Sequence, residues 1–460
     1  MSTHDASIRH VRRAIALLLA LAACSCSPVQ TSAIPSGTDE FGDVRVAALL
    51  AGRPRIFEHV VVVVQENRTP DNLFNGLPGA DTVRSGMNSH GQSVPFAAIS
   101  LTAAYGLEHT HSAFVKSYAG GKMDGFDTVH SNCSGKCPPE DTRAYAYVKP
   151  SQTRPYFAMA QQYAFADRMF QSNEGPSFPA HLYIVAGTSA PRRGSDLRIA
   201  ENPRTPRGGT TAGCDSPEGT LVALIEPNGR EHWHGFPCID RPSIFGLLDK
   251  KHLSWRYYQA HAGSGLWNAP DALTQVRYGP RYATNVVYPP SRFLSDVRAR
   301  TLAAVTFVTP TAANSDHAQI TERSGPSWVA SVVNAIGTSP YWKNTAIFVT
   351  WDDWGGWYDH VKPIRYDAYS LGFRVPLVVV SPYTPQGYVS HRQHEFGSIL
   401  KFLERNFGLD SLETTDLRAD DFSDCFDFRQ PPRAFVRIPA PRGAADFLRE
   451  PVSQADPDDY

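Results

Sequence analysis

Two acidic segments each follow an apolar run: Glu66-Asn67 comes after "HVVVVVQ", and Asp352-Asp353 comes after "TAIFVTW". Carboxylate and amide oxygens are preferred ligands of hard divalent cations, which polarise phosphoryl oxygens. One such segment alone is more typical of a turn or a helix cap. Two of them, the second followed by the Gly-rich "WGGWYDH", favour a hard-cation site. Oxygen ligands admit Mg, Ca, Mn or Zn.

Ser177 stands in "NEGPSFPAHLYIVAGTS". Gly175-Pro176 predicts a sharp turn, and Pro179 suits the first turn of a helix. The Ser177 hydroxyl is therefore expected at a helix N-terminus, where free backbone N–H groups attract an anion. The alternative is that Ser177 is an N-cap, which is the more common role of a serine before a helix.

Several histidines lie near these segments. His109 and His111 precede "GGKMDGFD", and His317 follows an apolar run. A lone histidine is more often structural than catalytic. A phosphoryl-transfer site, however, needs a proton donor for the leaving oxygen and positive charge around the phosphoryl group, which histidine supplies near neutral pH. For Asp359-His360 the structural interpretation is favoured over a catalytic one.

The elements that position these residues follow from the apolar pattern. Runs at 59–64, 303–309, 345–351 and 375–383 predict strands buried on both faces. Segments 181–187, 327–337 and 396–408 predict helices. This alternation predicts an α/β fold with three layers, in which helices cover both faces of a mainly parallel sheet. Ligand groups gather beyond the carboxyl ends of such strands, so the two acidic segments are expected at one edge.

The chain has 460 residues. That exceeds the usual size of one core, yet no boundary divides the body, so a single catalytic domain is expected over 55–460. Within it, 190–240 is rich in Gly, Pro and Arg and is expected to be an insertion or lid, and 410–460 an irregular tail. Lys+Arg 44 against Asp+Glu 45 gives a net charge of -1, which excludes the basic field of a non-specific nucleic-acid binder.

The N-terminus indicates export. Arg9, Arg12 and Arg13 precede an apolar stretch at 14–23, which is too short to span a bilayer. "LAAC" at 21–24 resembles a lipobox. We therefore expect a lipoprotein-type signal peptide over 1–23, a flexible tether over 24–54, and a periplasmic or cell-surface protein anchored through lipid on Cys24. A plain signal peptide cut nearby is the alternative.

The cysteines beyond the leader suit an oxidising compartment. Cys133 and Cys137 lie four residues apart, and Cys214 and Cys238 bracket a loop, so disulfides are expected there. Cys425 is expected to be structural or unpaired.

Five ordered motifs carry a resemblance: "VVVVVQENRTPDNLF", "GGKMDGF", "GPSFPAHLYIVAGTS", "SPYWKNTAIFVTWDDWGGWYDHV", and "GFRVPLVVVSPY" with "GYVSHRQHEFGSILKFLERNFGL". The chain resembles the bacterial phosphoesterase family over about residues 56–409. That family contains secreted acid phosphatases and non-specific phospholipases C and has an alkaline-phosphatase-like core.

The resemblance implies roles for particular residues. Its metal ligands fall on Glu66, Asn67, Ser177, Asp352 and Asp353, which in the acid phosphatase branch surround one divalent ion. Ser177 is the implied nucleophile, giving a phosphoseryl intermediate. The phosphate-facing histidines are matched by His109 and His317, with His111 as a neighbour.

The chain also departs from the family pattern. Pro70 stands where an aromatic residue is usual, Ala180-His181 replace Asn-Arg, and "WDDWGGWYDH" lacks the Asp-Glu-Asn-Asp run of the phospholipase branch. The first hypothesis is therefore an acid phosphatase acting on monoesters. The second is a phospholipase C acting on phosphodiester lipids, and the third is a non-catalytic surface binding protein that keeps the fold.

Overall fold

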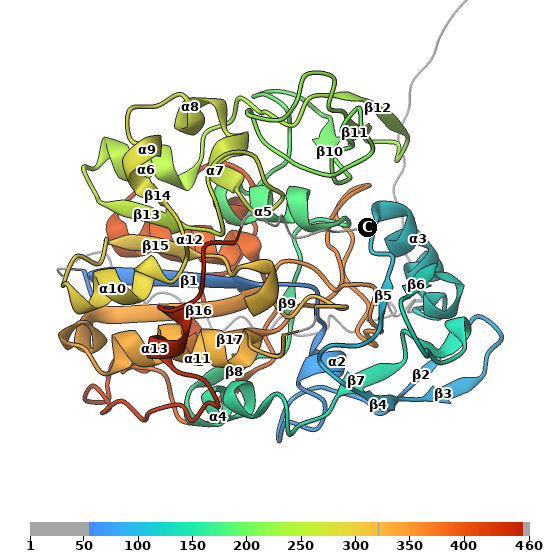
Figure 1. The fold of residues 1–460 in the computed structure, drawn as a ribbon, viewed down its shortest axis with the longest axis horizontal. Helices are drawn as coiled ribbons and strands as arrows, with labels where there is room; N and C mark the ends of the chain where they lie inside the picture. The colour runs from blue at the N-terminus through green and yellow to red at the C-terminus, as the bar shows by residue number, and fades with distance from the viewer. Residues whose placement is uncertain (1–54, 321, 454–460) are drawn as a thin grey trace, which may run out of the picture.

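The computed structural model describes residues 55–320 and 322–453, and within them an eight-stranded sheet forms the centre of the molecule (Figure 1). Its order is β14-β13-β15-β1-β16-β17-β8-β18. Every pairing is parallel except the two that β17 makes with β16 and β8. The predicted mainly parallel sheet is confirmed. The strands are β1 (His59–Gln65), β8 (Ala164–Ala166), β13 (Trp255–Tyr258), β14 (Val286–Val287), β15 (Val305–Val308), β16 (Thr345–Trp351), β17 (Leu377–Val380) and β18 (Val389–Ser390).

The valine run forms β1, which lies between β15 and β16. Val60 pairs with Val305 on one side, and Gln65 pairs with Trp351 on the other. All five valines are at most 1% exposed. Because β1 has a strand on each side and a helical layer over each face, apolar side chains suit every position, and the run does not alternate with polar residues.

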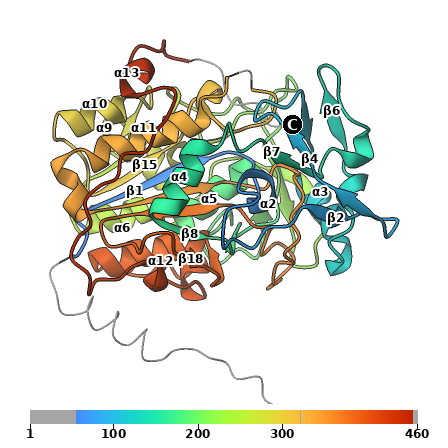
Figure 2. The ribbon, with the colours of Figure 1, turned by 90° about the horizontal axis from the view of Figure 1, so that it is seen from below.

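Helices cover both faces of the sheet (Figures 1 and 2). One layer contains α5 (Ser177–Ala186), α6 (Ile244–Lys250) and α12 (Phe396–Phe407). The other contains α4 (Arg154–Gln162), α10 (Arg292–Arg298) and α11 (Gly325–Gly337). α12 ends at Gly408, whose φ of 61° is the left-handed conformation that glycine adopts freely at a helix end. The predicted three-layer architecture is confirmed.

Residues 85–148 form a small lobe at the carboxyl edge of the sheet, with its own apolar cluster around Phe114 and Phe126. Trp354 and Trp357 from the loop after β16 belong to that cluster, so the lobe packs directly on this loop. Its elements are β2 (Ser85–Met87), β3 (Ser93–Pro95), β4 (Ala97–Ile99), β5 (Tyr105–Leu107), α3 (His111–Tyr118), β6 (Ser131–Cys133) and β7 (Ala146–Val148).

Segment 190–240 contains a small antiparallel sheet of β10 (Arg198–Ile199), β11 (Val222–Ile225) and β12 (Glu231–Gly235). The segment after residue 409 is mostly irregular, but it buries Phe422 and Phe447 against the body. The remaining short elements are α2 (Pro70–Leu73), β9 (Met169–Phe170), α7 (Ala269–Ala272), α8 (Thr274–Arg277), α9 (Tyr282–Asn285), β19 (His394–Glu395) and α13 (Ala444–Phe447).

The expected disulfides are present: Cys133 is bonded to Cys137, and Cys214 to Cys238, while Cys425 is buried and unbonded. Among the described residues, every helix is too short or too polar to cross a membrane. The predicted signal peptide, the tether and Cys24 lie outside the described residues.

Candidate functional site

The two acidic segments meet at one edge of the sheet. Because β1 and β16 are parallel neighbours in register, Glu66-Asn67 and Asp352-Asp353 leave the sheet side by side. The backbone N–H of Asn67 donates to Asp352 Oδ1 at 3.0 Å, as does that of Asp353 at 2.8 Å. All four side chains are buried. The structure therefore brings the predicted carboxylates and amide together.

Ser177 reaches this group from the N-terminus of α5. It is the first residue of α5, whose N-cap is Pro176, so the alternative interpretation of Ser177 as an N-cap is wrong. Its Oγ donates to Asp353 Oδ2 at 3.1 Å, and Asp353 Oδ1 accepts from the N–H of Gly355 at 2.7 Å. The next helical N–H, of Phe178, donates to Asn202 Oδ1. The serine hydroxyl, rather than this N–H, faces the acidic group.

The polar atoms at the centre of the group have the character of cation ligands. Within the described residues, Asn67 Oδ1 and Asp352 Oδ2 are buried and accept no hydrogen bond. A buried acceptor without a donor costs about 1–3 kcal/mol, so native structures usually give it a partner. A divalent cation satisfies several such oxygens at once. The donor set of carboxylates, amide and hydroxyl thus fits a metal ion.

The predicted phosphate-facing histidines lie beside this group. His109 Nδ1 donates to the carbonyl of Leu107 at 2.9 Å, so its Nε2 accepts from the Asn67 side-chain amide at 3.0 Å. This hydrogen bond orients the amide and directs its oxygen away from His109. The ring of His317 lies 6.2 Å from that of His109, and its Nδ1 donates to the carbonyl of Ala318.

His111 has different surroundings. Its Nδ1 lies 2.5 Å from Glu231 Oε1, and its Nε2 lies 3.6 Å from Glu174 Oε2. Burial lowers the pKa of His111, but the two carboxylates outweigh burial and raise that pKa to about 9. Arg365 also pairs with Glu174. The structure therefore places His111 in a charged cluster that it shares with Glu174 and with Glu231 of β12.

One residue of the site was missed by sequence reasoning. His181 lies one helical turn after Ser177 on α5, and its Nε2 is 3.4 Å from Glu66 Oε1 and 3.8 Å from Asp352 Oδ2. Residues four apart on a helix share a face. That spacing from the implied nucleophile was the available signal, but the histidine was considered only as a departure from the family pattern.

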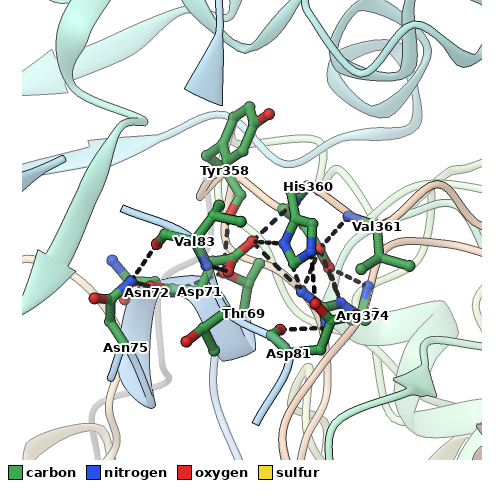
Figure 3. A network of polar contacts seen from close by, with 12 residues as sticks. Thr69, Asp71, Asn72, Asn75, Asp81, Val83, Tyr358, His360, Val361 and Arg374 are labelled. Atoms are coloured by element: carbon green, nitrogen blue, oxygen red, sulfur yellow. Dashed lines mark hydrogen bonds and ion pairs between the residues drawn. The ribbon is translucent and has the colours of Figure 1, made fainter. Parts of the chain in front are cut away.

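A network of ion pairs and hydrogen bonds joins the segment that follows β1 to the segment that follows β16 (Figure 3). Asp71, in α2, accepts from the backbone N–H and Nδ1 of His360 through one oxygen and from the N–H of Val83 through the other. Arg374 donates to Asp359 and also to Asp71. Asp359-His360 thus tie the loop after β16 to the turn after β1, which supports their structural interpretation.

Arg68 holds the same turn on its other side. Its guanidinium donates to the carbonyls of Asp316 and Leu101 and lies 5.0 Å from the ring of Trp357. Burial lowers the pKa of Arg68 to about 10, so it stays charged at neutral pH. These contacts connect β1, the segment after β15 and the small lobe.

The model of the phosphoesterase family matches residues 57–410. The chain belongs to the phosphoesterase family. The match covers β1, α5 and β16, and so every residue of the site described above.

Several curated relatives of this phosphoesterase are phospholipases C. A non-hemolytic phospholipase C of Pseudomonas aeruginosa is 24% identical over 83% of this chain and 58% of its own length. Phospholipase C B of Mycobacterium tuberculosis is 24% identical over 82% of this chain and 78% of its own. Non-specific phospholipase C6 of Arabidopsis thaliana is 23% identical over 86% and 77%. The chain thus spans under three fifths of the Pseudomonas relative's length.

Solved structures give weaker likenesses. A protein in the alkaline phosphatase superfamily from Vibrio parahaemolyticus is 10% identical, with a TM-score of 0.38 over 84% of this chain and 78% of its own. Ps i-CgsB in complex with a neocarrahexaose is 11% identical, with a TM-score of 0.39 over 80% and 76%. Scores this low carry no argument about function.

Proposed function

We propose that the chain is a metal-dependent phosphatase that hydrolyses phosphate monoesters through a phosphoseryl intermediate. The hydrogen bond from Ser177 Oγ to Asp353, in a group with buried oxygens that lack donors, carries this proposal. A serine hydroxyl that donates to a carboxylate beside a cation site is poised to lose its proton and act as a nucleophile.

In the proposed chemistry one divalent ion would be held by Glu66, Asn67, Ser177, Asp352 and Asp353. When bound, it lowers the pKa of the serine hydroxyl and withdraws charge from the phosphoryl oxygens. Ser177 Oγ attacks phosphorus while its proton leaves along the hydrogen bond to Asp353. The bond from phosphorus to the leaving oxygen breaks, and that oxygen takes the Nε2 proton of a protonated His317, because Nε2 of His109 accepts from Asn67.

The second step regenerates the serine. Water attacks phosphorus from the side that the leaving group vacated and gives a proton to His317. The bond between Ser177 Oγ and phosphorus breaks, and the proton held by Asp353 returns to the serine oxygen. His317 holds a non-bridging oxygen in both steps, and His109 does so when its Nε2 carries a proton and gives up the contact with Asn67. Positioning and electrostatics supply most of the rate in such reactions. This role suits side chains that are held by backbone carbonyls, as these two are.

The experiment is a Ser177→Ala variant assayed on p-nitrophenyl phosphate. Turnover should fall by about 10³-fold or more, as expected when a nucleophile is removed. Mass spectrometry of acid-quenched wild type should find phosphate on Ser177. Ser331→Ala removes a buried hydroxyl on α11, away from the site, and should leave turnover unchanged. Full activity in Ser177→Ala would rule the mechanism out.

A phospholipase C is the second candidate, and the phospholipase C names of the relatives favour it. Its substrate would be a phosphodiester lipid rather than a monoester. Wild type should be compared on p-nitrophenyl phosphate, p-nitrophenylphosphorylcholine and phosphatidylcholine vesicles. A higher kcat/KM on the monoester supports the phosphatase, and a higher value on either diester supports the phospholipase.

For the whole chain we propose export, with a signal peptide over 1–23, lipid on Cys24, a tether over 24–54 and one catalytic domain beyond it. The apolar stretch and the "LAAC" sequence support this proposal. Metabolic labelling with a radioactive fatty acid should mark wild type in a membrane fraction. Cys24→Ser should lose the label, and a label that persists would exclude this anchor.

A further inference from the structure

His181 occupies the position of a metal ligand, although the implied ligand set contains only oxygen atoms. Its side chain is 1% exposed and faces Glu66 and Asp352, the same carboxylates that the proposed function assigns to the cation. One oxygen of each carboxylate and Nε2 of His181 lie within 4.8 Å of one another. Three elements, β1, α5 and β16, converge at this point.

The spacing of these donors is that of ligands around an ion. An N–H···O hydrogen bond is usually 2.7–3.2 Å long, whereas Nε2 lies 3.4 Å and 3.8 Å from the two carboxylate oxygens. Two ligand atoms that each lie about 2.1 Å from one ion can be at most about 4.2 Å apart, and both separations satisfy this limit. In addition, Asp352 Oδ2, which faces His181, accepts no hydrogen bond within the described chain.

The surroundings hold His181 in place. All ten residues of α5 are buried, and the helix packs against α7 and α12. The imidazole ring lies nearly parallel to that of Trp267, with an interplanar angle of 24° and 6.4 Å between centroids. Ser177 sits one turn earlier on the same face, so the helix presents the hydroxyl and the imidazole to the acidic group together.

We propose that His181 is a nitrogen ligand of the ion held by Glu66 and Asp352, and that this donor directs the centre to Zn rather than to Mg or Ca. Imidazole suits Zn, whereas Mg and Ca take oxygen ligands almost exclusively. The inference rests on the proposed function, whose oxygen ligands it keeps, and it adds a donor and a metal class to it.

The test is pulsed electron paramagnetic resonance of the purified, Mn²⁺-loaded full-length protein, because a directly bound imidazole gives a nitrogen coupling to the ion. Wild type should show this coupling, His181→Gln should lose it, and Zn²⁺ affinity should fall by at least 10-fold. Mg²⁺ affinity should change much less. His59→Gln is the control, since His59 lies at the other end of β1, where its Nδ1 donates to the carbonyl of Ala303. His109→Gln should keep the nitrogen coupling, because His109 contacts Asn67 and is not a proposed ligand of the ion.

His181→Asp is the second variant, for use if His181→Gln does not fold. It keeps a ligand but replaces nitrogen with oxygen, so Mn²⁺ should still bind without the coupling and the preference should move towards Mg²⁺. A coupling that survives in either His181 variant, or a wild type without coupling, overturns the proposal. The Ser177→Ala assay decides the proposed function separately, because a centre without nitrogen can still support a phosphoseryl enzyme.

Discussion

Asn67 shows how one residue serves two parts of the site. Its φ of 64° lies in the left-handed region, which asparagine tolerates better than most side chains. This conformation allows the backbone N–H to donate to Asp352 while the side-chain amide donates to His109. The remaining amide oxygen is the atom assigned to the cation. A sharp turn after β1 therefore sets the geometry of the proposed ligand.

Gly355 leaves the space that the left-handed conformation of Asn67 needs. Its φ is 62°, and a Cβ on it would lie 2.3 Å from the carbonyl oxygen of Asn67 and 2.7 Å from the Asn67 Cβ. Gly355→Ala should therefore displace Asn67 and lower kcat by about 10²-fold, the effect of a misplacement of about 1 Å. Turnover of p-nitrophenyl phosphate measures this.

Gly408→Ala is the control for that prediction. Gly408 has a similar φ of 61° but open space around its Cβ position. It should lose about 1 kcal/mol of stability from left-handed strain and keep its turnover. Equal turnover in the two variants would contradict the role given to Gly355.

Residue types and strand positions explain what could be predicted about the site. Glu66-Asn67 and Asp352-Asp353 were predicted to meet because both follow runs typical of buried parallel strands. Ser177 was predicted at the start of a helix, and only the resemblance to the family joined it to them. His181 was missed because only the register of β1 against β16, combined with the orientation of α5, places it opposite Glu66. The surroundings of His111 depend on Glu231, which lies 120 residues further along the chain.

At the scale of elements, Arg374 joins three segments. It donates to Asp359 after β16, to Asp71 in α2 and to the carbonyl of Asp167 after β8. Arg374 and both carboxylates are fully buried. Burial raises the pKa of Asp359, and the nearby guanidinium opposes that rise. The arginine thus balances acidic groups that are far apart in the chain.

Arg374→Met should destabilise the fold by about 3–5 kcal/mol, because it leaves buried carboxylates without their cation. Urea unfolding followed by circular dichroism measures this loss. Arg429→Met is the control, since Arg429 pairs with Asp427 on the surface and is 90% exposed. Its midpoint should not move measurably. Similar midpoints for the two variants would show that the network does not stabilise the fold.

The same scale shows which elements the sequence pattern could predict. β1, β15, β16 and β17 follow apolar runs, and α11 and α12 have clear periodicity and ends. β8, β14 and β18 have only two or three residues, and β13 has the mixed sequence Trp-Arg-Tyr-Tyr, so they carry little pattern of their own. These segments form strands because they pair with neighbouring strands of the sheet, not because of their own sequence pattern. The small lobe over 85–148 is likewise defined by its packing on Trp354 and Trp357.

At the scale of the whole molecule, an ion pair connects the 190–240 segment to the body. His111 at the start of α3 contacts Glu231 of β12 and Glu174 before α5. The folded pKa of His111, about 9, is above its usual value of 6.5. A raised histidine pKa contributes stability that is fully present below pH 6.5 and is lost as pH rises through 9.

Wild type should therefore lose on the order of 2 kcal/mol of stability between pH 6.5 and 9 relative to a His111→Asn variant. Urea unfolding at several pH values measures the difference between the two proteins. Hydrogen exchange should show that β10 to β12 loosen first as pH rises. Parallel pH profiles for the two proteins would mean that His111 does not hold this segment.

The central place of β1 also has a consequence for how the chain folds. Its partners begin at Val305 and Thr345, more than 240 residues later. Until those segments have been synthesised and have docked, both edges of the valine strand are unpaired and its faces are not packed against helices. Pairing across such a separation is slow, and an unpaired apolar strand is a template for aggregation. Refolding yield should therefore fall steeply with protein concentration, so that a holdase which binds the N-terminal third of the chain would raise it.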